Sequence, residues 1–145
     1  MKKDRKNIIL QSLAAMLEEK NMSKITTASL AEKSNITEAA LYRHFPSKRS
    51  IYAELFSFCD DTIFAKCNEI KKEKISAQEK VKKIFIFFML FIEKNKGFAR
   101  LLSREALSSA EQNVSDSVNL FYERFELVLR QMLKEDEKNL TTQAG

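Results

Sequence analysis

Residues 37–47 carry side chains suited to contacts with DNA. Their pattern predicts a helix of less than three turns over 37–45, which Pro46 stops before a new helix begins. Leu41 and Phe45 are four residues apart and form an apolar edge, so small and polar residues occupy the opposite side. Such a helix buries too little apolar surface to serve as core, and its shape fits the major groove of DNA.

The outward side of this short helix combines small residues with hydrogen-bonding ones. Ala39 and Ala40 let the backbone approach the bases, and their methyl groups suit thymine methyls. Arg43 has the geometry to pair with guanine O6 and N7, whereas Glu38 favours the helix start and can accept from cytosine N4. These residue types predict direct reading of base edges.

Phosphate contacts are expected around the same helix, through hydroxyl, imidazole and helix-start N–H groups. Lys48 and Arg49 occupy the first turn of the next helix, where a cation is disfavoured by roughly 0.3–1 kcal/mol. A bound phosphate would reverse that sign, although a solvated surface pair is the alternative. The candidate DNA-binding residues are Thr26, Thr27, Ala28, Thr37, Glu38, Ala39, Ala40, Tyr42, Arg43, His44, Lys48 and Arg49.

The elements that position these residues read as helices throughout. The 145 residues include two Gly and one Pro, which leaves little room for hairpins and predicts an all-α protein. Asn35 tolerates the left-handed conformation of a helix end, so a helix-turn-helix is expected there. We expect helices over 4–20, 28–34, 37–45, 47 to about 70 or 72, 76–94, 98–107 and 111–137, with breaks at 21–23 and 95–97.

The chain is expected to divide into a helix-turn-helix module over 1–48, a helical regulatory and partner-binding bundle over 49–138 and a frayed tail over 139–145. Each long helix has a stripe of residues expected to be buried. In the first helix these are Ile8, Ile9, Ser12, Leu13, Met16 and Leu17, and in the last they are Val114, Val118, Phe121, Phe125, Val128, Leu129 and Met132.

The positive charge is concentrated in the N-terminal third. Residues 1–50 hold ten Lys or Arg and five Asp or Glu, whereas residues 51–145 hold fifteen of each. The net charge of +5 therefore belongs to the first third, as expected for a module that contacts nucleic acid.

An enzyme is not expected from the residue types present. The single histidine, His44, has a role on DNA, and no Ser/His/Asp set, Gly-rich phosphate loop or metal-ligand spacing appears. No cofactor is expected. Cys59 and Cys67 fall ~12 Å apart along one helix, too far for a disulfide, which indicates a reduced cytoplasmic protein. A signal peptide and a transmembrane segment are not expected either.

The run from Ile84 to Ile92 is apolar on all sides of its helix. One interpretation is a helix buried all round, and the other is a helix with one side lining an exposed groove. We expect Phe85, Phe88 and Ile92 in the core and Phe87 and Phe91 near the surface. The basic residues nearby, Lys66, Lys71, Lys72, Lys74, Lys82 and Lys83, form either a solvated flank or a surface for an acidic peptide.

Two segments resemble the DNA-binding region of the TetR family: 25–31, and 37–48 with its Tyr42-x-His44-Phe45-x-x-Lys48 ending. The resemblance implies a TetR-like fold in which the third helix reads bases and Tyr42, His44 and Lys48 contact the DNA backbone. Many members have Gly at the position of Asn35. A ligand-responsive transcriptional repressor, the commonest role in this family, is the alternative function.

Further segments resemble one branch of that family, the bacterial nucleoid occlusion factors: 9–18, 95–97, 100–102, 120–126 and 129–131. This implies a nucleoid-associated protein that binds palindromic sites in double-stranded DNA and antagonises FtsZ polymers over the chromosome. The matching partner-binding residues are Phe58, Lys66, Phe87, Leu90 and Lys94. Relatives have Arg at 66 and 94 and Gly at 90, and Lys lacks the bidentate fork of Arg.

Members of the family usually continue for two helices that form a homodimer, and palindromic sites require that two-fold symmetry. We expect the fold to lack those two dimerisation helices. We therefore expect weak or altered dimerisation, an exposed apolar seam on the last helix and reduced operator affinity.

Overall fold

The structure is a computed structural model that describes residues 2–19 and 25–144, with side chains for 5–19 and 25–138. The described residues form helices and their connections, as the composition predicted. The helices are α1 (Lys2–Glu18), α2 (Thr27–Lys33), α3 (Glu38–His44), α4 (Lys48–Lys71), α5 (Ala77–Lys94), α6 (Lys96–Leu102), the 3₁₀ helix η1 (Ser109–Glu111) and α7 (Gln112–Ala144).

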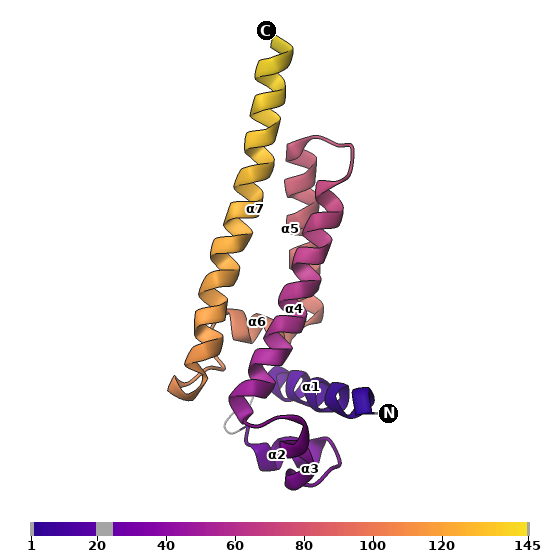
Figure 1. Ribbon diagram of the computed structural model, residues 1–145, viewed down its shortest axis with the longest axis vertical. Coiled ribbons are helices and arrows are strands. Elements are labelled where there is room, and N and C mark those ends of the chain that lie inside the picture. Colours follow the sequence, from indigo (N-terminus) through magenta and orange to yellow (C-terminus); the bar gives the residue numbers. More distant parts are fainter. Residues whose placement is uncertain (1, 20–24, 145) are drawn as a thin grey trace.

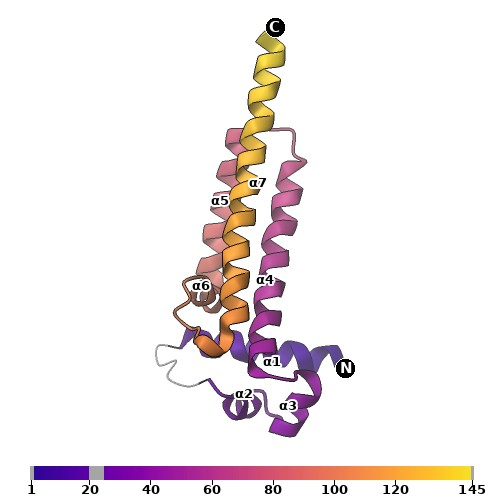
Figure 2. The same cartoon turned by 60° about the vertical axis from the view of Figure 1, so that its left-hand side comes forward.

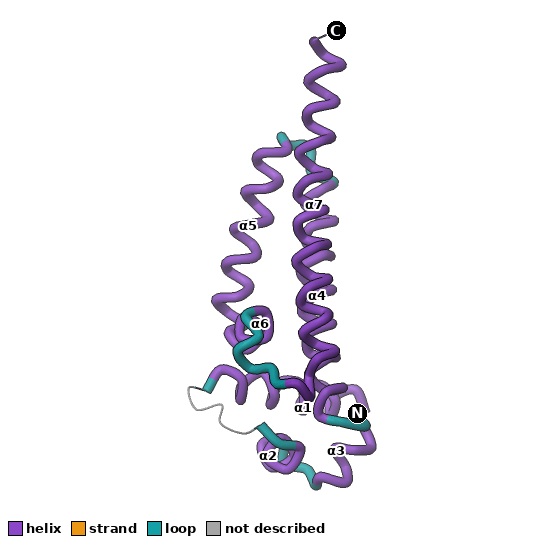
Figure 3. The backbone as a smooth tube through the Cα atoms, turned by 90° about the vertical axis from the view of Figure 1, so that its left-hand side faces the viewer, coloured by secondary structure: helices purple, strands orange, loops and turns teal. Residues whose placement is uncertain are grey.

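Figure 1 shows α4, α5 and α7 running along the length of the molecule, with α2 and α3 at one end. α1 lies across the long helices and contacts α4 and α6. The view in Figure 2 places α4, α5 and α7 side by side, and α4 and α5 both pack against α7. α2 and α3 therefore lie at the opposite end of the molecule from the C-terminal end of α7 (Figure 3).

Side-chain caps fix most helix starts where the sequence predicted them. Thr37 accepts from the Ala40 N–H at the start of α3, and Ser47 forms a capping box with Ser50 at α4. Ser76 caps α5 by accepting from the Glu79 N–H. The expected break at 21–23 lies outside the described residues.

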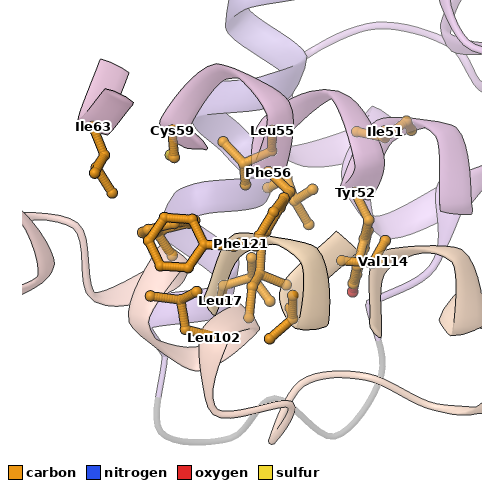
Figure 4. Packing of buried hydrophobic residues seen from close by; sticks show 14 of the residues in the cluster. Leu17, Ile51, Tyr52, Leu55, Phe56, Cys59, Ile63, Leu102, Val114 and Phe121 are labelled. Atoms are coloured by element: carbon orange, nitrogen blue, oxygen red, sulfur yellow. The ribbon is translucent and has the colours of Figure 1, made fainter. Parts of the chain in front are cut away.

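The interior contains a cluster of aromatic rings contributed by α4 to α7. Phe121 contacts Phe56, Phe64 and Phe98, with ring centroids 6.3, 5.5 and 6.1 Å away. Figure 4 shows Phe121 beside Phe56, with aliphatic side chains from α1 and α6 below them. Cys59 and Cys67 are free and buried within this packing, and burial raises the pKa of Cys59 to about 12.

Two expectations for the last helix differ in outcome. Val114, Val118, Phe121, Phe125 and Met132 are buried as predicted, whereas Val128 and Leu129 are only partly buried. The helix also continues to Ala144 through the segment expected to fray, since no Gly or Pro interrupts it before Gly145. Its exposed apolar residues are Leu120, Tyr122, Leu127 and Leu133.

The expected core assignment of α5 was wrong in part. Phe85 is 46% exposed, and Phe88 and Ile92 are only partly buried, because α5 is covered by its neighbours on some sides only. Phe87 and Phe91 are partly buried as well. The interpretation of a helix buried all round is therefore wrong, and an open apolar face remains at Phe85, Ile86, Met89 and Leu90.

Three further sequence-based expectations require correction. Ile8 is 44% exposed although it was expected in the buried stripe of α1, whereas Ile9, Leu13 and Leu17 are buried. α5 ends at Lys94 as predicted, but the break after it is Asn95 alone rather than 95–97, because α6 begins at Lys96. α6 also ends at Leu102 rather than Leu107, close to Arg104, which has a φ of 62°.

Candidate nucleic-acid and partner interfaces

α3 is held by its inner edge and presents its outer side to solvent. Leu41 is fully buried and Phe45 nearly so, as the spacing predicted. Ala39, Tyr42 and Arg43 are exposed on the other side. The arrangement is that of a short helix anchored on one side with small and hydrogen-bonding groups free to meet a DNA groove.

The turn before α3 depends on a left-handed residue. Asn35 has a φ of 57°, and its N–H donates to the Glu32 carbonyl 3.1 Å away. The Ile36 N–H donates to the Ala31 carbonyl at 3.0 Å. These bonds close the end of α2 and set the direction in which α3 leaves it.

Three of the predicted DNA-binding residues contact one another. The Thr27 hydroxyl donates to Glu38 Oε1 at 2.7 Å, and Thr27 Oγ1 lies 3.1 Å from Tyr42 Oη. Since the Thr27 proton is already used, the Tyr42 hydroxyl is the donor in the second contact. The network joins the start of α2 to α3, and a phosphate bound by Tyr42 would draw its proton away from Thr27.

The start of α2 offers backbone donors beside this network. Thr26 forms a capping box with Ser29, whose N–H donates to Thr26 Oγ1 at 3.0 Å. Thr26 and Ala28 are exposed and Thr27 is half-buried, so the helix start is accessible to a phosphate. Thr37, Glu38 and Arg49 are likewise exposed, and Ala40, His44 and Lys48 are half-buried.

Lys48 has a partner that the sequence did not indicate. Its Nζ lies 3.3 Å from Glu111 Oε1 and 5.5 Å from the centroid of the Tyr52 ring. Burial alone would raise the pKa of Glu111, but hydrogen bonds from Ser108 and the charge of Lys48 outweigh it, so the pKa is lowered. The lysine expected to bind phosphate is thus shared with a carboxylate in η1, just before α7.

Lys6 is a further basic residue beside α3 that the sequence prediction missed. Its Nζ lies 5.3 Å from the centroid of Phe45, at the end of α3. Arg5 and Lys6 are exposed, so α1 places positive charge next to the DNA-facing helices. The cluster of basic residues at the N-terminus was the signal that could have identified them.

The residues of the expected partner face lie along α4 and α5. Lys66 forms an ion pair with Glu69 at 3.3 Å and lies 5.9 Å from the centroid of the Phe87 ring. Leu90 and Lys94 are exposed further along α5. The structure therefore brings Lys66 and Phe87 together across the α4–α5 seam and leaves an accessible apolar and basic surface beside them.

Phe58 lies at a different part of this region, on the border of a groove between α1 and α4. Its side chain is 65% exposed. The groove has a volume of about 280 Å³. Leu10, Ala14 and Asn95 are lining residues that the sequence did not single out; the full lining is Asn7, Leu10, Gln11, Ala14, Leu55, Phe58, Cys59 and Asn95.

A second depression lies between α4 and α7. Arg124 stacks on Phe64, 4.0 Å from the ring centroid, and its NH1 lies 3.7 Å from Asp60 Oδ2. Burial raises the pKa of Asp60, although the charge of Arg124 opposes the shift. In the described part of the chain no group of three His, Cys, Asp or Glu side chains could hold a metal ion, and no helix is long and apolar enough to cross a membrane.

Comparison with known proteins agrees with this geometry. Residues 9–55, which include α2, α3 and the start of α4, match the family described as bacterial regulatory proteins, tetR family. Proteins described as nucleoid occlusion factor SlmA are similar over nearly the whole chain. The protein from Vibrio vulnificus is 38% identical over 135 residues, which cover 92% of this chain and 69% of the relative.

Two other relatives with the same description come from different genera. The Alteromonas mediterranea protein is 40% identical over 134 residues, covering 92% of this chain and 69% of its own. The Marinobacter nauticus protein is 36% identical over 136 residues, which cover 94% of this chain and 70% of the relative. The similarity therefore extends from the DNA-reading helices through the bundle.

Proposed function

The chain belongs to the family of SlmA nucleoid occlusion factors, and we therefore propose that it binds palindromic DNA and antagonises FtsZ polymers over the chromosome. The DNA-binding part of this proposal rests on α3 and on the residues around it. Ala39, Ala40 and Arg43 would read base edges, while Tyr42, His44 and Lys48 would contact phosphates. Thr26, Thr27 and Ala28 would present the start of α2 to the backbone, and Arg49 adds charge at the start of α4.

The observation that carries the partner-binding part is the exposure of Phe58 beside the α1–α4 groove. A phenylalanine that is 65% exposed at the border of a groove is available to a partner peptide. Lys66 and Lys94 supply positive charge along α4 and α5, which suits an acidic segment of FtsZ. Phe87 and Leu90 would add apolar contact on α5.

The alternative of a ligand-responsive repressor needs a cavity among α5, α6 and α7. Rings occupy that region: Phe88 lies 6.1 Å from Phe121 and 5.2 Å from Phe125, and Phe98 lies 6.1 Å from Phe121. This packing favours the division regulator. We propose a binding protein rather than an enzyme, located on the nucleoid in the cytoplasm.

The test combines FtsZ with a DNA duplex selected from a random pool for tight binding to this protein. FtsZ polymers formed with GTP should disassemble when the protein and its duplex are added, as measured by sedimentation. Phe58→Ala should abolish the effect because it removes an exposed ring at the groove. Leu120→Ala is the matched control, since Leu120 is also 65% exposed but lies on α7.

Two results would contradict the proposal separately. Failure to recover any preferred duplex would contradict sequence-specific DNA binding. Polymers that are indifferent to the DNA-bound protein would contradict the FtsZ part alone. Equal activity of Phe58→Ala and Leu120→Ala would remove Phe58 from the partner site.

A further inference from the structure

Glu111 is a buried carboxylate at the junction between the DNA-reading end and the bundle. It is 2% exposed, and the other buried polar side chains among the described residues are two serines. The Ser108 N–H donates to Glu111 Oε2 at 2.8 Å, and the Ser108 hydroxyl donates to the same oxygen. The carboxylate is therefore fixed in place, and its other oxygen faces Lys48.

Lys48 lies between this carboxylate and an aromatic ring. Its side chain retains 36% exposure, while its Nζ is 3.3 Å from Glu111 Oε1 and 5.5 Å from the Tyr52 ring centroid. Figure 4 shows Tyr52 reaching from α4 toward Val114 at the start of α7. The ammonium is thus held at the surface with a negative charge directly behind it.

This geometry changes what a DNA phosphate meets at the start of α4. Part of the field of Lys48 is cancelled by Glu111, and because the carboxylate is shielded from water, that cancellation is screened less than for an exposed pair. A phosphate must therefore share the ammonium with an existing partner. A phosphate that is not held in a fixed position gains little binding free energy from Lys48. A phosphate held in place by the docking of α3 gains a directed contact with it.

We propose that Glu111 is a specificity-determining residue for DNA binding. It lowers the attraction of Lys48 for the phosphates of DNA, whatever the base sequence. The proposal rests on the DNA-binding function above. Glu111 acts through Lys48 and does not contact DNA. Its effect is to reduce sequence-independent binding, so that the contacts of α3 with base edges account for a larger share of the affinity.

The experiment measures binding to a short duplex of random sequence by fluorescence anisotropy over a series of KCl concentrations. Glu111→Gln should tighten binding roughly threefold and make the slope of log K against log salt more negative by up to about 0.9, the value of one added phosphate contact. Glu54→Gln is the control for loss of a negative charge, because Glu54 is exposed elsewhere on α4. It should change the slope much less.

A double-mutant cycle tests whether Glu111 acts through Lys48. Lys48→Gln alone should weaken binding and flatten the salt slope, and Glu111→Gln should have no further effect in that background. Thermal unfolding checks that each variant is folded. If Glu111→Gln does not fold, Glu111→Asp keeps the charge but withdraws it by one methylene, and it should give an intermediate slope.

The outcomes separate this inference from the DNA-binding proposal. If the wild-type protein binds no duplex at any salt concentration, DNA binding itself fails and the inference fails with it. If the wild type binds but Glu111→Gln weakens binding, the inference alone is overturned. The inference is also overturned if Glu111→Gln tightens binding equally in the wild-type and Lys48→Gln backgrounds. It is likewise overturned if Glu54→Gln tightens binding as much as Glu111→Gln does.

Discussion

The hydroxyl and carboxylate groups of Thr27, Glu38 and Tyr42 are ordered by one another. Contacts of 2.7 and 3.1 Å fix the orientation of these side chains between α2 and α3. Ordering them before binding reduces the conformational entropy lost when DNA binds. The same network opposes rotation of α3 relative to α2, so these three residues stabilise the position of α3.

Asn35 gives a prediction at the level of one residue. Its φ of 57° is tolerated by Gly, which has no Cβ, and by Asn, whose short polar side chain can hydrogen-bond locally, but it is disfavoured for other residues that carry a Cβ. Asn35→Ala should lower the free energy of unfolding by about 1 kcal/mol, as measured by urea denaturation. Asn35→Gly should leave it nearly unchanged. Equal losses in both variants would show that the Asn side chain, rather than the backbone conformation, stabilises the turn.

The outward side of α3 was predictable because the placement of its residues is local. The spacing of Leu41 and Phe45 fixes which side of α3 faces outward, and the exposure of Tyr42 and Arg43 agrees with it. The pairing of Lys48 with Glu111 was not predictable, because no local pattern relates the start of α4 to η1. That contact follows only from how α7 packs against α4.

Most helix starts were predictable for a similar reason, but the start of α6 was not. Ser47 and Ser76 form caps with residues three positions away, so their role is visible in the sequence. Gly97 was expected to lie in the break after α5, yet it lies inside α6 and is buried. A Cβ on Gly97 would lie 2.7 Å from the Ala14 carbonyl oxygen, so this glycine permits close packing of α6 on α1.

The α1–α6 contact gives a prediction at the level of helices. Gly97→Ala should lower the free energy of unfolding by roughly 1–3 kcal/mol, because the added methyl meets backbone at 2.7 Å and the Leu17 Cβ at 3.2 Å. Urea denaturation measures the change. Lys96→Ala is the control on the adjacent exposed position and should have little effect. A Gly97→Ala protein as stable as the wild type would mean that α6 can shift away from α1 without loss.

The composition of α5 predicted an apolar helix, but it did not predict which of its residues are buried. The run from Ile84 to Ile92 has no polar side from which an inner face could be assigned. Ile84 is buried and Phe85 is about half exposed, a difference set by the positions of α4, α6 and α7. Only the packing of whole helices decides which of these apolar residues belong to the core.

At the scale of the molecule, the Lys48–Glu111 pair connects the DNA-reading end to the last helix. The pKa of Glu111 is lowered from its ordinary value of 4.5 in the folded protein. A lowered pKa means that the ionised carboxylate contributes stability above about pH 4.5, and that this contribution is lost as the pH falls through the folded pKa. The ionisation of one residue therefore affects the stability of the whole bundle in acid.

Comparison of the wild type with Glu111→Gln as a function of pH tests this linkage. The wild type should be the more stable protein near neutral pH, and the difference in free energy of unfolding should shrink as the pH is lowered below 4.5. Urea denaturation at a series of pH values gives the difference directly. A difference that stays constant down to acid pH would show that the ionised form of Glu111 has no special stability in the fold.

The packing of α1 on α6 also bears on the order in which the protein forms during translation. The Arg100 side chain donates to the Glu19 carbonyl at 2.7 Å, across 81 positions of sequence. At a ribosomal rate of about 5–20 residues per second, α1 waits roughly 4–16 seconds for its partner helix to be synthesised. During that time the side chains of Leu13 and Leu17, fully buried in the finished fold, lack their neighbours on α6. The helix-turn-helix is thus synthesised early, but the packing of α1 is complete only after α6 has been synthesised.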